Sequence, residues 1–433
     1  MQLHHARPAK RIAFALVAAG VLVATAACSP SSSTGISAET GGAGVSPAGA
    51  TSSAGSSSAG SSGSSSSSSP STTAEPVPVA TVSESPAFNA ADISPTEPVT
   101  ISVAHGTITQ LSVTNPEGAA VNGTMSADGA SWTLAEPLGF GRTYRVSGIA
   151  TGTDNKTVPI QGEYTTVTPT DEITTTISPG DGAVVGVAAP VIVHLGYTPE
   201  DKALIEKHVS ITTTPHVAGA WAWIRHDGDQ FESLDWRPQN YWPANTVVHV
   251  ESNIYGLPFG DDYYGGENKT SDFTIGRNQV VKADANAHNI VVQQDGVTVA
   301  SYDASYGSGD EIGDPNRVTR SGVHVVMDKQ ETTKMSNPAY GYTNLTEHWA
   351  VRISNNGEFI HQNQGTVSDQ GVDNVSHGCI NLSAESAEAY FNSAIYGDPV
   401  EVTGTSVPLS AADGDIYDWA IPWDEWLTMS ASA

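Results

Sequence analysis

From about residue 95 onward, short runs of β-branched and aromatic residues alternate with turn residues, and this pattern restricts the possible folds more than any other feature of the chain. Such runs occupy residues 99–103, 106–113, 131–134 and 143–147. Val, Ile, Thr and the aromatic residues favour strands, and many short strands bounded by turns are typical of β-sandwiches. The turns are supplied by 42 Gly and 25 Pro residues. We therefore predict a mainly β protein.

The strand-rich region begins with two successive blocks, residues 91–170 and 171–276, which share a sequence pattern. The run Phe140-Gly-Arg-Thr-Tyr-Arg-Val-Ser-Gly-Ile-Ala in the first block resembles Ala244-Asn-Thr-Val-Val-His-Val-Glu-Ser-Asn-Ile in the second. We predict two immunoglobulin-like β-sandwich modules without disulfides. Four Trp residues of the second block are predicted to be packing anchors rather than a sugar-binding platform: Trp221, Trp223, Trp236 and Trp242.

Residues 277–404 form a third strand-rich block, which we predict to be a separate domain. It contains one clear helical segment, at 384–396. Ser383 precedes this segment as a good N-cap, and Gly397 follows it as a stop. Beyond this domain, residues 405–433 carry three Trp within eight positions. Since so many Trp side chains would not be left in solvent, we predict that this C-terminal extension packs on the other domains.

Residues 1–27 have the pattern of a signal peptide for export. Lys10 and Arg11 precede an apolar run that is too short for a comfortable membrane span. Small residues directly before Cys28 resemble a bacterial lipobox, at which a peptidase cuts and the thiol receives diacylglycerol, although Thr25 replaces the usual Leu. We therefore expect an exported protein at the outer face of the cytoplasmic membrane and in the cell wall, with the lipid on Cys28 as its only membrane contact. The alternative is cleavage at a nearby Ala-x-Ala-like site, which would give a free secreted protein.

Residues 28–90 are predicted to form a disordered tether that starts at the lipidated cysteine. Positions 29–75 consist almost wholly of Ser, Gly, Ala and Thr, which cannot build a core. The whole chain has 46 acidic against 18 basic side chains, a formal net charge of −28. A surface with this charge repels nucleic acids, so we expect no nucleic-acid partner.

Cys379 is the residue around which we expect the chemistry. The chain has two Cys residues, so lipidation of Cys28 would leave Cys379 without a disulfide partner. His377, Cys379 and Asn381 stand at alternate positions, and in an extended segment their side chains share one face. A His beside a Cys can take its proton and prepare it for nucleophilic attack.

Two further positions fit this chemistry. Gly378 has no side chain, so a reacting carbonyl could approach the backbone and the Cys379 amide could stabilise an oxyanion. His361 lies upstream and could reach the same pocket by loop closure. A zinc site of His361, His377 and Cys379 is one alternative, but the spacing is tighter than in common zinc motifs and no fourth ligand is evident. A structural, unreactive Cys is the other alternative, and we expect neither metal nor cofactor.

The motif Ser376-His377-Gly378-Cys379-Ile380-Asn381 resembles the signature of the L,D-transpeptidase (YkuD-type) catalytic domain, Ser/Thr-His-Gly-Cys-x-Asn, with His361 as its upstream histidine. Residues 214–221 and 236–243 resemble the second immunoglobulin-like domain of mycobacterial-type members. Residues 419–426 resemble the C-terminal extension of the same members. The resemblance covers about residues 170–430, and the first module fits the pattern less closely.

The resemblance implies an acyltransferase that forms 3→3 cross-links between peptidoglycan stem peptides, one acting as donor and the other as acceptor. Cys379 would attack a tetrapeptide stem after the L-configured centre of diaminopimelate, release D-Ala and pass the acyl group to the side-chain amine of a neighbouring stem. His377 would be the general base, and His361 would orient the site or the acceptor. The oxyanion hole would be formed by Tyr342 with the amides of Gly378 and Cys379. Ser376 and Asn381 would hold the motif strand, and carbapenem β-lactams would acylate the same thiolate.

Two stretches depart from the mycobacterial-type pattern. After His361, the sequence Gln362-Asn-Gln-Gly365 replaces Ser-Ala-Pro-Trp, and the lid Tyr is absent from the region of Thr332, Thr333 and Met335. Both changes concern the lid and the β-lactam preference rather than the nucleophile. Water or a protein amine could also attack the thioester, which would give an L,D-carboxypeptidase or an enzyme that attaches protein to the wall. A non-enzymatic wall-binding lipoprotein is the remaining alternative, against which the intact motif argues.

Overall fold

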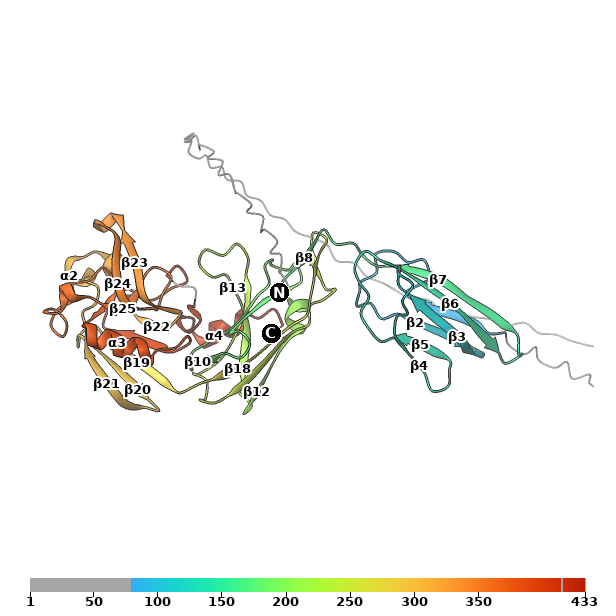
Figure 1. The fold of residues 1–433 in the computed structure, drawn as a ribbon, viewed down its shortest axis with the longest axis horizontal. Helices are drawn as coiled ribbons and strands as arrows, with labels where there is room; N and C mark the ends of the chain where they lie inside the picture. Colours follow the sequence, from blue (N-terminus) through green and yellow to red (C-terminus); the bar gives the residue numbers. More distant parts are fainter. Residues whose placement is uncertain (1–78, 414–415, 433) are drawn as a thin grey trace, which may run out of the picture. The chain divides into compact units, whose positions relative to one another are not determined.

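The computed structural model describes residues 79–413 and 416–432, and this part of the chain is mainly β, as predicted (Figure 1). The predicted signal peptide, Cys28 and residues 29–78 of the predicted tether lie outside the described residues. Within the described part, no helix is both long and apolar enough to cross a membrane.

The first module is a sandwich of two antiparallel sheets around Ile101, Trp132 and Ile160. One sheet has the order β1-β2-β5-β4, with β1 (Thr81–Ser85), β2 (Thr100–Ala104), β5 (Ser131–Leu134) and β4 (Gly123–Met125). The other has the order β3-β6-β7, with β3 (Gly106–Thr114), β6 (Thr143–Gly152) and β7 (Thr157–Thr165).

Strand β1 corrects the predicted boundary of the tether at residue 90. Thr81 to Ser85 pair antiparallel with β2, in the register Thr81↔Ala104. Ala80, just before the strand, is buried in the core of the module. The backbone hydrogen bonds of β2 and this apolar contact together order a segment whose flanking Ser- and Pro-rich sequence predicts disorder.

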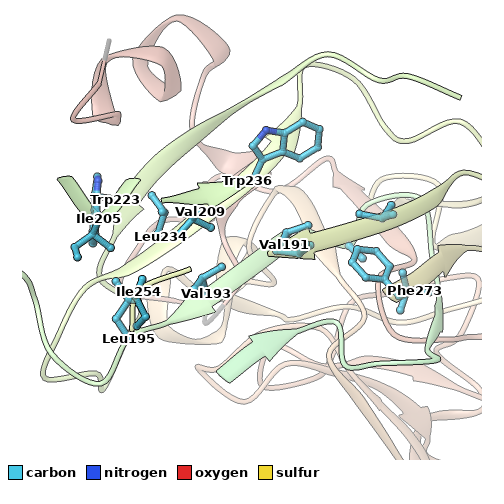
Figure 2. Close-up of a cluster of buried hydrophobic side chains, with 14 of the residues drawn as sticks. Val191, Val193, Leu195, Ile205, Val209, Trp223, Leu234, Trp236, Ile254 and Phe273 are labelled. Carbon is cyan, nitrogen blue, oxygen red and sulfur yellow. The ribbon is translucent and has the colours of Figure 1, made fainter. Parts of the chain in front are cut away.

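The second module is another sandwich, with sheets β10-β18-β15-β12 and β13-β14-β11-β9, a small third sheet β16-β17-β8 and the short helix α1 (Lys202–Lys207). Its strands are β8 (Asp171–Ile173), β9 (Thr176–Ser178), β10 (Val184–Val185), β11 (Val191–His194), β12 (Val209–Thr214), β13 (Gly219–Ile224), β14 (Ser233–Pro238), β15 (Val247–Ser252), β16 (Pro258–Gly260), β17 (Tyr263–Gly265) and β18 (Lys269–Ile275). Figure 2 shows its core, where Trp223 and Trp236 lie among aliphatic side chains. Trp223, Trp236 and Trp242 are buried and Trp221 is partly buried against the same core, which confirms the predicted packing role.

The third domain holds the motif and also has two sheets. One has the order β21-β20-β19-β27-β22 and the other the order β23-β24-β25-β26. The strands are β19 (Gln279–Asp284), β20 (Asn289–Gln294), β21 (Val297–Asp303), β22 (Gly322–Val325), β23 (Asp328–Asn337), β24 (Tyr342–Arg352), β25 (Phe359–Gln362), β26 (Ile380–Leu382) and β27 (Pro399–Thr403). The helical elements are α2 (Gly309–Ile312), α3 (Ala384–Ser393) and the single 3-10 turns η1 (Pro315–Arg317), η2 (Pro338–Tyr340) and η3 (Gln364–Thr366). Helix α3 packs against β24 and β25, so the core lies among the two sheets and this helix.

Helix α3 is the predicted helix, but it ends at Ser393 rather than at residue 396. Ser383 caps its start by accepting a hydrogen bond from the Ser386 amide, as predicted. At its end, the Asp398 carboxylate accepts from the Ile395 amide at 3.0 Å. The ammonium of Lys329 binds the Phe391 carbonyl at 2.8 Å. These two contacts replace the next helical turn; the first is local, and the second comes from a strand more than 60 residues away.

The C-terminal extension lies on the second module through its Trp side chains. It contains η4 (Asp418–Ala420), α4 (Trp423–Trp426) and η5 (Leu427–Met429). Trp426 is fully buried and its indole N–H donates to the Ala220 carbonyl at 2.9 Å. The Arg237 guanidinium of β14 lies over the rings of Trp419, Trp423 and Trp426, at 4.8, 5.1 and 4.4 Å from their centroids. Such cation–π contacts in a buried setting hold the extension in place.

Candidate active site

The parallel pairing of β25 with β26 brings the two predicted histidine positions to the same edge of the second sheet. His361 on β25 pairs in register with Asn381 on β26. Cys379 lies directly before β26, so the upstream histidine becomes a neighbour of the thiol across the strand pair. The structure therefore brings His361, Cys379 and Asn381 together, together with Tyr342, Ser376 and His377 on the wall of one cavity.

Ser376 fixes the turn that presents Cys379. Its hydroxyl donates to the Cys379 carbonyl at 2.6 Å and accepts from the Gly378 amide at 3.0 Å. Thr319 adds a third bond, from its hydroxyl to the Gly378 carbonyl at 2.8 Å. Gly378 has a φ of +127°, which side chains disfavour, so the turn needs a glycine there.

These bonds correct the predicted oxyanion hole. The Gly378 amide already donates to the Ser376 hydroxyl and is therefore not available to an oxyanion. The Cys379 amide, in contrast, has no hydrogen-bond acceptor among the described residues. Of the two predicted backbone donors, only the Cys379 amide is free to bind a developing negative charge.

His361 is the histidine that contacts the nucleophile. Its ring is buried, and Cys379 lies close enough to the ring to raise its pKa. Its Nδ1 lies 2.8 Å from the Gln362 carbonyl and 3.3 Å from Glu347 Oε2, which leaves Nε2 for the thiol. Burial alone would lower the pKa of His361, but the bonds to Cys379 and Glu347 raise it to about 10.

His377 has a different environment from the one that its sequence position suggested. Its side chain is exposed, and its ring packs between Tyr340 and Tyr342 with centroids 5.2 and 5.4 Å away. Partial desolvation and the nearby Arg317 guanidinium lower the pKa of the His377 ring.

The Cys379 thiol donates a hydrogen bond to the Gly357 carbonyl at 3.6 Å.

Two cavities meet at Cys379, and four residues line both of them: Met335, Tyr342, His377 and Cys379. The first cavity has a volume of about 300 Å³ and is also lined by Leu345, Glu347, His361, Asn363 and Asn381. The second cavity, of about 280 Å³, is also lined by Arg320, Lys334, Arg352, Glu358 and Phe359. Cys379 can therefore be approached from two cavities.

The sequence motif did not predict several residues of the site. Glu347 and Tyr340 reach the histidines from β24 and from the turn before it, and the Gly357 carbonyl comes from the loop before β25. Within the described residues, no group of three or more His, Cys, Asp or Glu side chains could hold a metal ion.

Residues 278–402 match the family model of the L,D-transpeptidase catalytic domain, and residues 90–258 match that of a bacterial Ig domain. L,D-transpeptidase 5 of Mycobacterium tuberculosis (strain ATCC 25618 / H37Rv) is 48% identical over 356 residues, which cover 82% of this chain and 78% of that protein. The chain belongs to the L,D-transpeptidase family. It is an enzyme of this class, with an immunoglobulin-like region and a YkuD domain, as predicted.

Other L,D-transpeptidases are similar over different lengths. L,D-transpeptidase 2 of Mycobacterium tuberculosis (strain CDC 1551 / Oshkosh) is 33% identical over 359 residues, which cover 82% of this chain and 86% of that protein. The solved structure of the L,D-transpeptidase LdtMt1 in complex with imipenem is 32% identical, with a TM-score of 0.44, and covers 54% of this chain and 99% of that one.

The stretch in which this L,D-transpeptidase departs from the mycobacterial-type pattern forms part of the first cavity. The Asn363 side chain accepts from the Gly365 amide at 3.0 Å and caps η3. Gln370 donates to the Asn363 carbonyl at 3.0 Å. A short polar turn therefore stands beside His361 at the place where the expected Trp is missing.

Proposed function

We propose that this L,D-transpeptidase forms 3→3 cross-links in peptidoglycan through a thioester on Cys379, using a tetrapeptide stem as donor. The observation that carries the proposal is the placing of Cys379 beside the buried His361 on the wall of one cavity, at the point where two cavities meet. A thiol paired with an imidazole is the arrangement that activates cysteine nucleophiles.

In the first step, Cys379 Sγ, whose proton is held by His361, attacks the carbonyl of the L-configured centre of diaminopimelate. The oxygen of that carbonyl gains negative charge and accepts a hydrogen bond from the Cys379 amide. The C–N bond to D-Ala then breaks, and the leaving amine takes the proton from His361. The products are the thioester on Cys379 and free D-Ala.

In the second step, the side-chain amine of a neighbouring stem attacks the thioester. His361 takes a proton from this amine, the new C–N bond forms and the C–S bond breaks, which regenerates the Cys379–His361 pair. Asn381 Oδ1 is buried at the wall of the first cavity and has no hydrogen-bond partner among the described residues. It is therefore placed to accept an N–H of the acceptor amine.

The contacts favour other roles for the two histidines than those that the family resemblance implied. His361 contacts the thiol and has a carboxylate partner, Glu347, so we propose His361 as the general base. His377 is exposed and lies against two Tyr rings, so we propose that it shapes the junction of the cavities. Tyr342 stands at this junction, where its hydroxyl would add to the oxyanion hole.

Product analysis with a tetrapeptide stem tests this function. The enzyme is incubated with the stem, and the released D-Ala and the joined stems are quantified by mass spectrometry. We expect free D-Ala together with a cross-linked dimer that has lost one D-Ala, and neither product from Cys379→Ala. Release of D-Ala with only tripeptide as the second product would instead make the enzyme an L,D-carboxypeptidase. No release from the wild type would contradict the proposal.

A further inference from the structure

The second cavity is basic, although the protein as a whole is strongly acidic. The chain has 18 Lys and Arg residues against 46 Asp and Glu, yet Arg320, Lys334 and Arg352 all line this one cavity beside Cys379. Glu358 is its only acidic lining residue. The first cavity, on the other side of the thiol, has Glu347 instead and no Lys or Arg. Because Glu347 lies 3.3 Å from the His361 ring, only the second cavity has an excess of charged side chains of one sign.

The acidic residue of the second cavity does little to offset this positive charge. Glu358 is 4% exposed, so its carboxyl group offers little surface to a ligand; burial raises its pKa, and His324 and Arg320 lower it in part. Its Oε1 accepts from the Arg320 amide at 2.9 Å, and its Oε2 has no hydrogen-bond partner among the described residues. The cavity is thus suited to a ligand group that brings its own negative charge.

The basic side chains differ in how far their donors are already used. Arg320 donates through Nε to Asp413 at 2.9 Å and through one terminal nitrogen to two backbone carbonyls, so it belongs to the wall. Arg352 lies over the Phe359 ring and donates to the Asn355 side chain at 3.1 Å. Arg352 forms no ion pair with any described residue, and most of its five N–H donors remain available. Lys334 is exposed at the rim and bonds the Thr346 hydroxyl.

We propose that the second cavity is the leaving-group subsite and that Arg352 binds the C-terminal carboxylate of the departing D-amino acid. This inference rests on the proposed function. The bond that breaks is the last peptide bond of the donor, so the carboxylate is only one residue away from the carbonyl that Cys379 attacks. A cavity of about 280 Å³ that runs from Cys379 to Arg352 has room for an amino acid of this size.

This subsite explains how the enzyme would recognise a stem that ends at the fourth residue. A guanidinium binds a carboxylate through two parallel hydrogen bonds, which fixes its position as well as its charge. In a stem with a fifth residue, the carboxylate moves one residue further from the scissile carbonyl, and an amide takes its place near Arg352. The geometry therefore favours tetrapeptide over pentapeptide donors.

The test compares two donors that differ in one group, the tetrapeptide with its free D-Ala carboxylate and the same peptide as its C-terminal amide. For each, kcat/KM is measured from the release of D-Ala or D-alaninamide. For the wild type we expect the free acid to be preferred by about 10- to 100-fold, the usual effect of a charge-assisted hydrogen bond. Arg352→Gln should lose this factor on the acid and keep its rate on the amide, so that the preference falls to about one.

The control variants distinguish a loss of carboxylate binding from a general loss of activity caused by damage to the fold. Arg145→Gln removes an equal charge from an exposed position of the first module and should leave the preference unchanged. Arg352→Lys keeps the charge without the planar fork and should retain part of the preference. Equal losses on both donors in Arg352→Gln, or a wild type that releases both leaving groups equally, would overturn the subsite while the proposed function stands. A wild type that releases neither would overturn the proposed function, and the subsite with it.

Discussion

Two residues outside the sequence motif form the surroundings of the Cys379 thiol. His361 supplies the ring that bonds the thiol, and Gly357 supplies the carbonyl that accepts from it. Glu347 holds the other side of the His361 ring. Because its pKa is raised to about 10, the buried imidazole holds a proton at neutral pH and can stabilise negative charge on the Cys379 sulfur without losing its orientation.

Substitution of the histidines distinguishes these roles. We expect His361→Gln to slow acylation of Cys379 by about 10²–10⁴-fold, because this change removes the general base. His377→Gln should slow acylation by less than about tenfold, because its ring does not bond the thiol in this structure. Intact-protein mass spectrometry with imipenem as the acylating reagent measures both rates, since the family resemblance predicts that carbapenems acylate this thiol. A larger loss in His377→Gln would return the role of base to His377.

At the scale of elements, the local residue pattern predicted where most strands lie. It did not predict the contacts that end an element or pair it with another. The runs at 99–103, 131–134 and 143–147 lie in β2, β5 and β6, because β-branched residues and flanking turns determine them locally. The predicted helix ended early because Asp398 accepts from the Ile395 amide just beyond it and because Lys329, from elsewhere in the fold, binds the Phe391 carbonyl.

The same limit applies to the active site. The sequence motif identifies Cys379 and its turn, since Ser376 and Gly378 act on neighbours one to three residues away. Which histidine contacts the thiol depends on the parallel pairing of β25 with β26. That pairing joins segments about twenty residues apart, and sequence spacing alone favoured the nearer His377.

The C-terminal extension should respond to pH through Asp418. This carboxyl is fully buried where η4 meets the second module, and burial together with Asp235 of β14 raises its pKa from 3.8 to about 8. His226 lowers that pKa in part. A raised folded-state pKa means that the stability from this group is fully present below pH 3.8 and is lost as the pH rises toward 8.

We therefore expect the melting temperature of the wild type to fall between pH 5 and pH 9 by more than that of Asp418→Asn, which keeps the shape of the carboxyl but cannot ionise. Thermal unfolding followed by circular dichroism at the two pH values gives the comparison. Asp424→Asn, an acid of the exposed part of the extension, is the matched control and should behave like the wild type. Parallel pH profiles for wild type and Asp418→Asn would show that Asp418 is ionised throughout.

At the scale of the whole molecule, the catalytic domain follows two β-sandwich modules in the chain. The N-terminal sequence is predicted to anchor the chain to the membrane. We propose that Cys28 carries the lipid anchor, as the small residues before it suggest. A diacylated cysteine gives stable membrane association, because each buried CH₂ contributes about 0.8 kcal/mol. The enzyme would then act on peptidoglycan within reach of the membrane surface.

Cell fractionation tests the anchor. We expect the wild type in the membrane fraction and Cys28→Ser in the soluble exported fraction, with unchanged acylation of Cys379 by imipenem in both. Membrane retention of Cys28→Ser would contradict lipidation at this position. Cys379→Ser serves as the control, because it removes the other thiol and should leave retention unaffected.

The most direct measurement is intact-protein mass spectrometry of the enzyme mixed with a tetrapeptide donor and no acceptor. We predict a mass gain equal to the tripeptide acyl group on the wild type, formed at a strongly reduced rate in His361→Gln and absent in Cys379→Ala. Proteolytic mapping should place the added mass on Cys379. D-Ala release without any acyl-enzyme, or an adduct that forms at the same rate in His361→Gln, would contradict a thioester mechanism that depends on the Cys379–His361 pair.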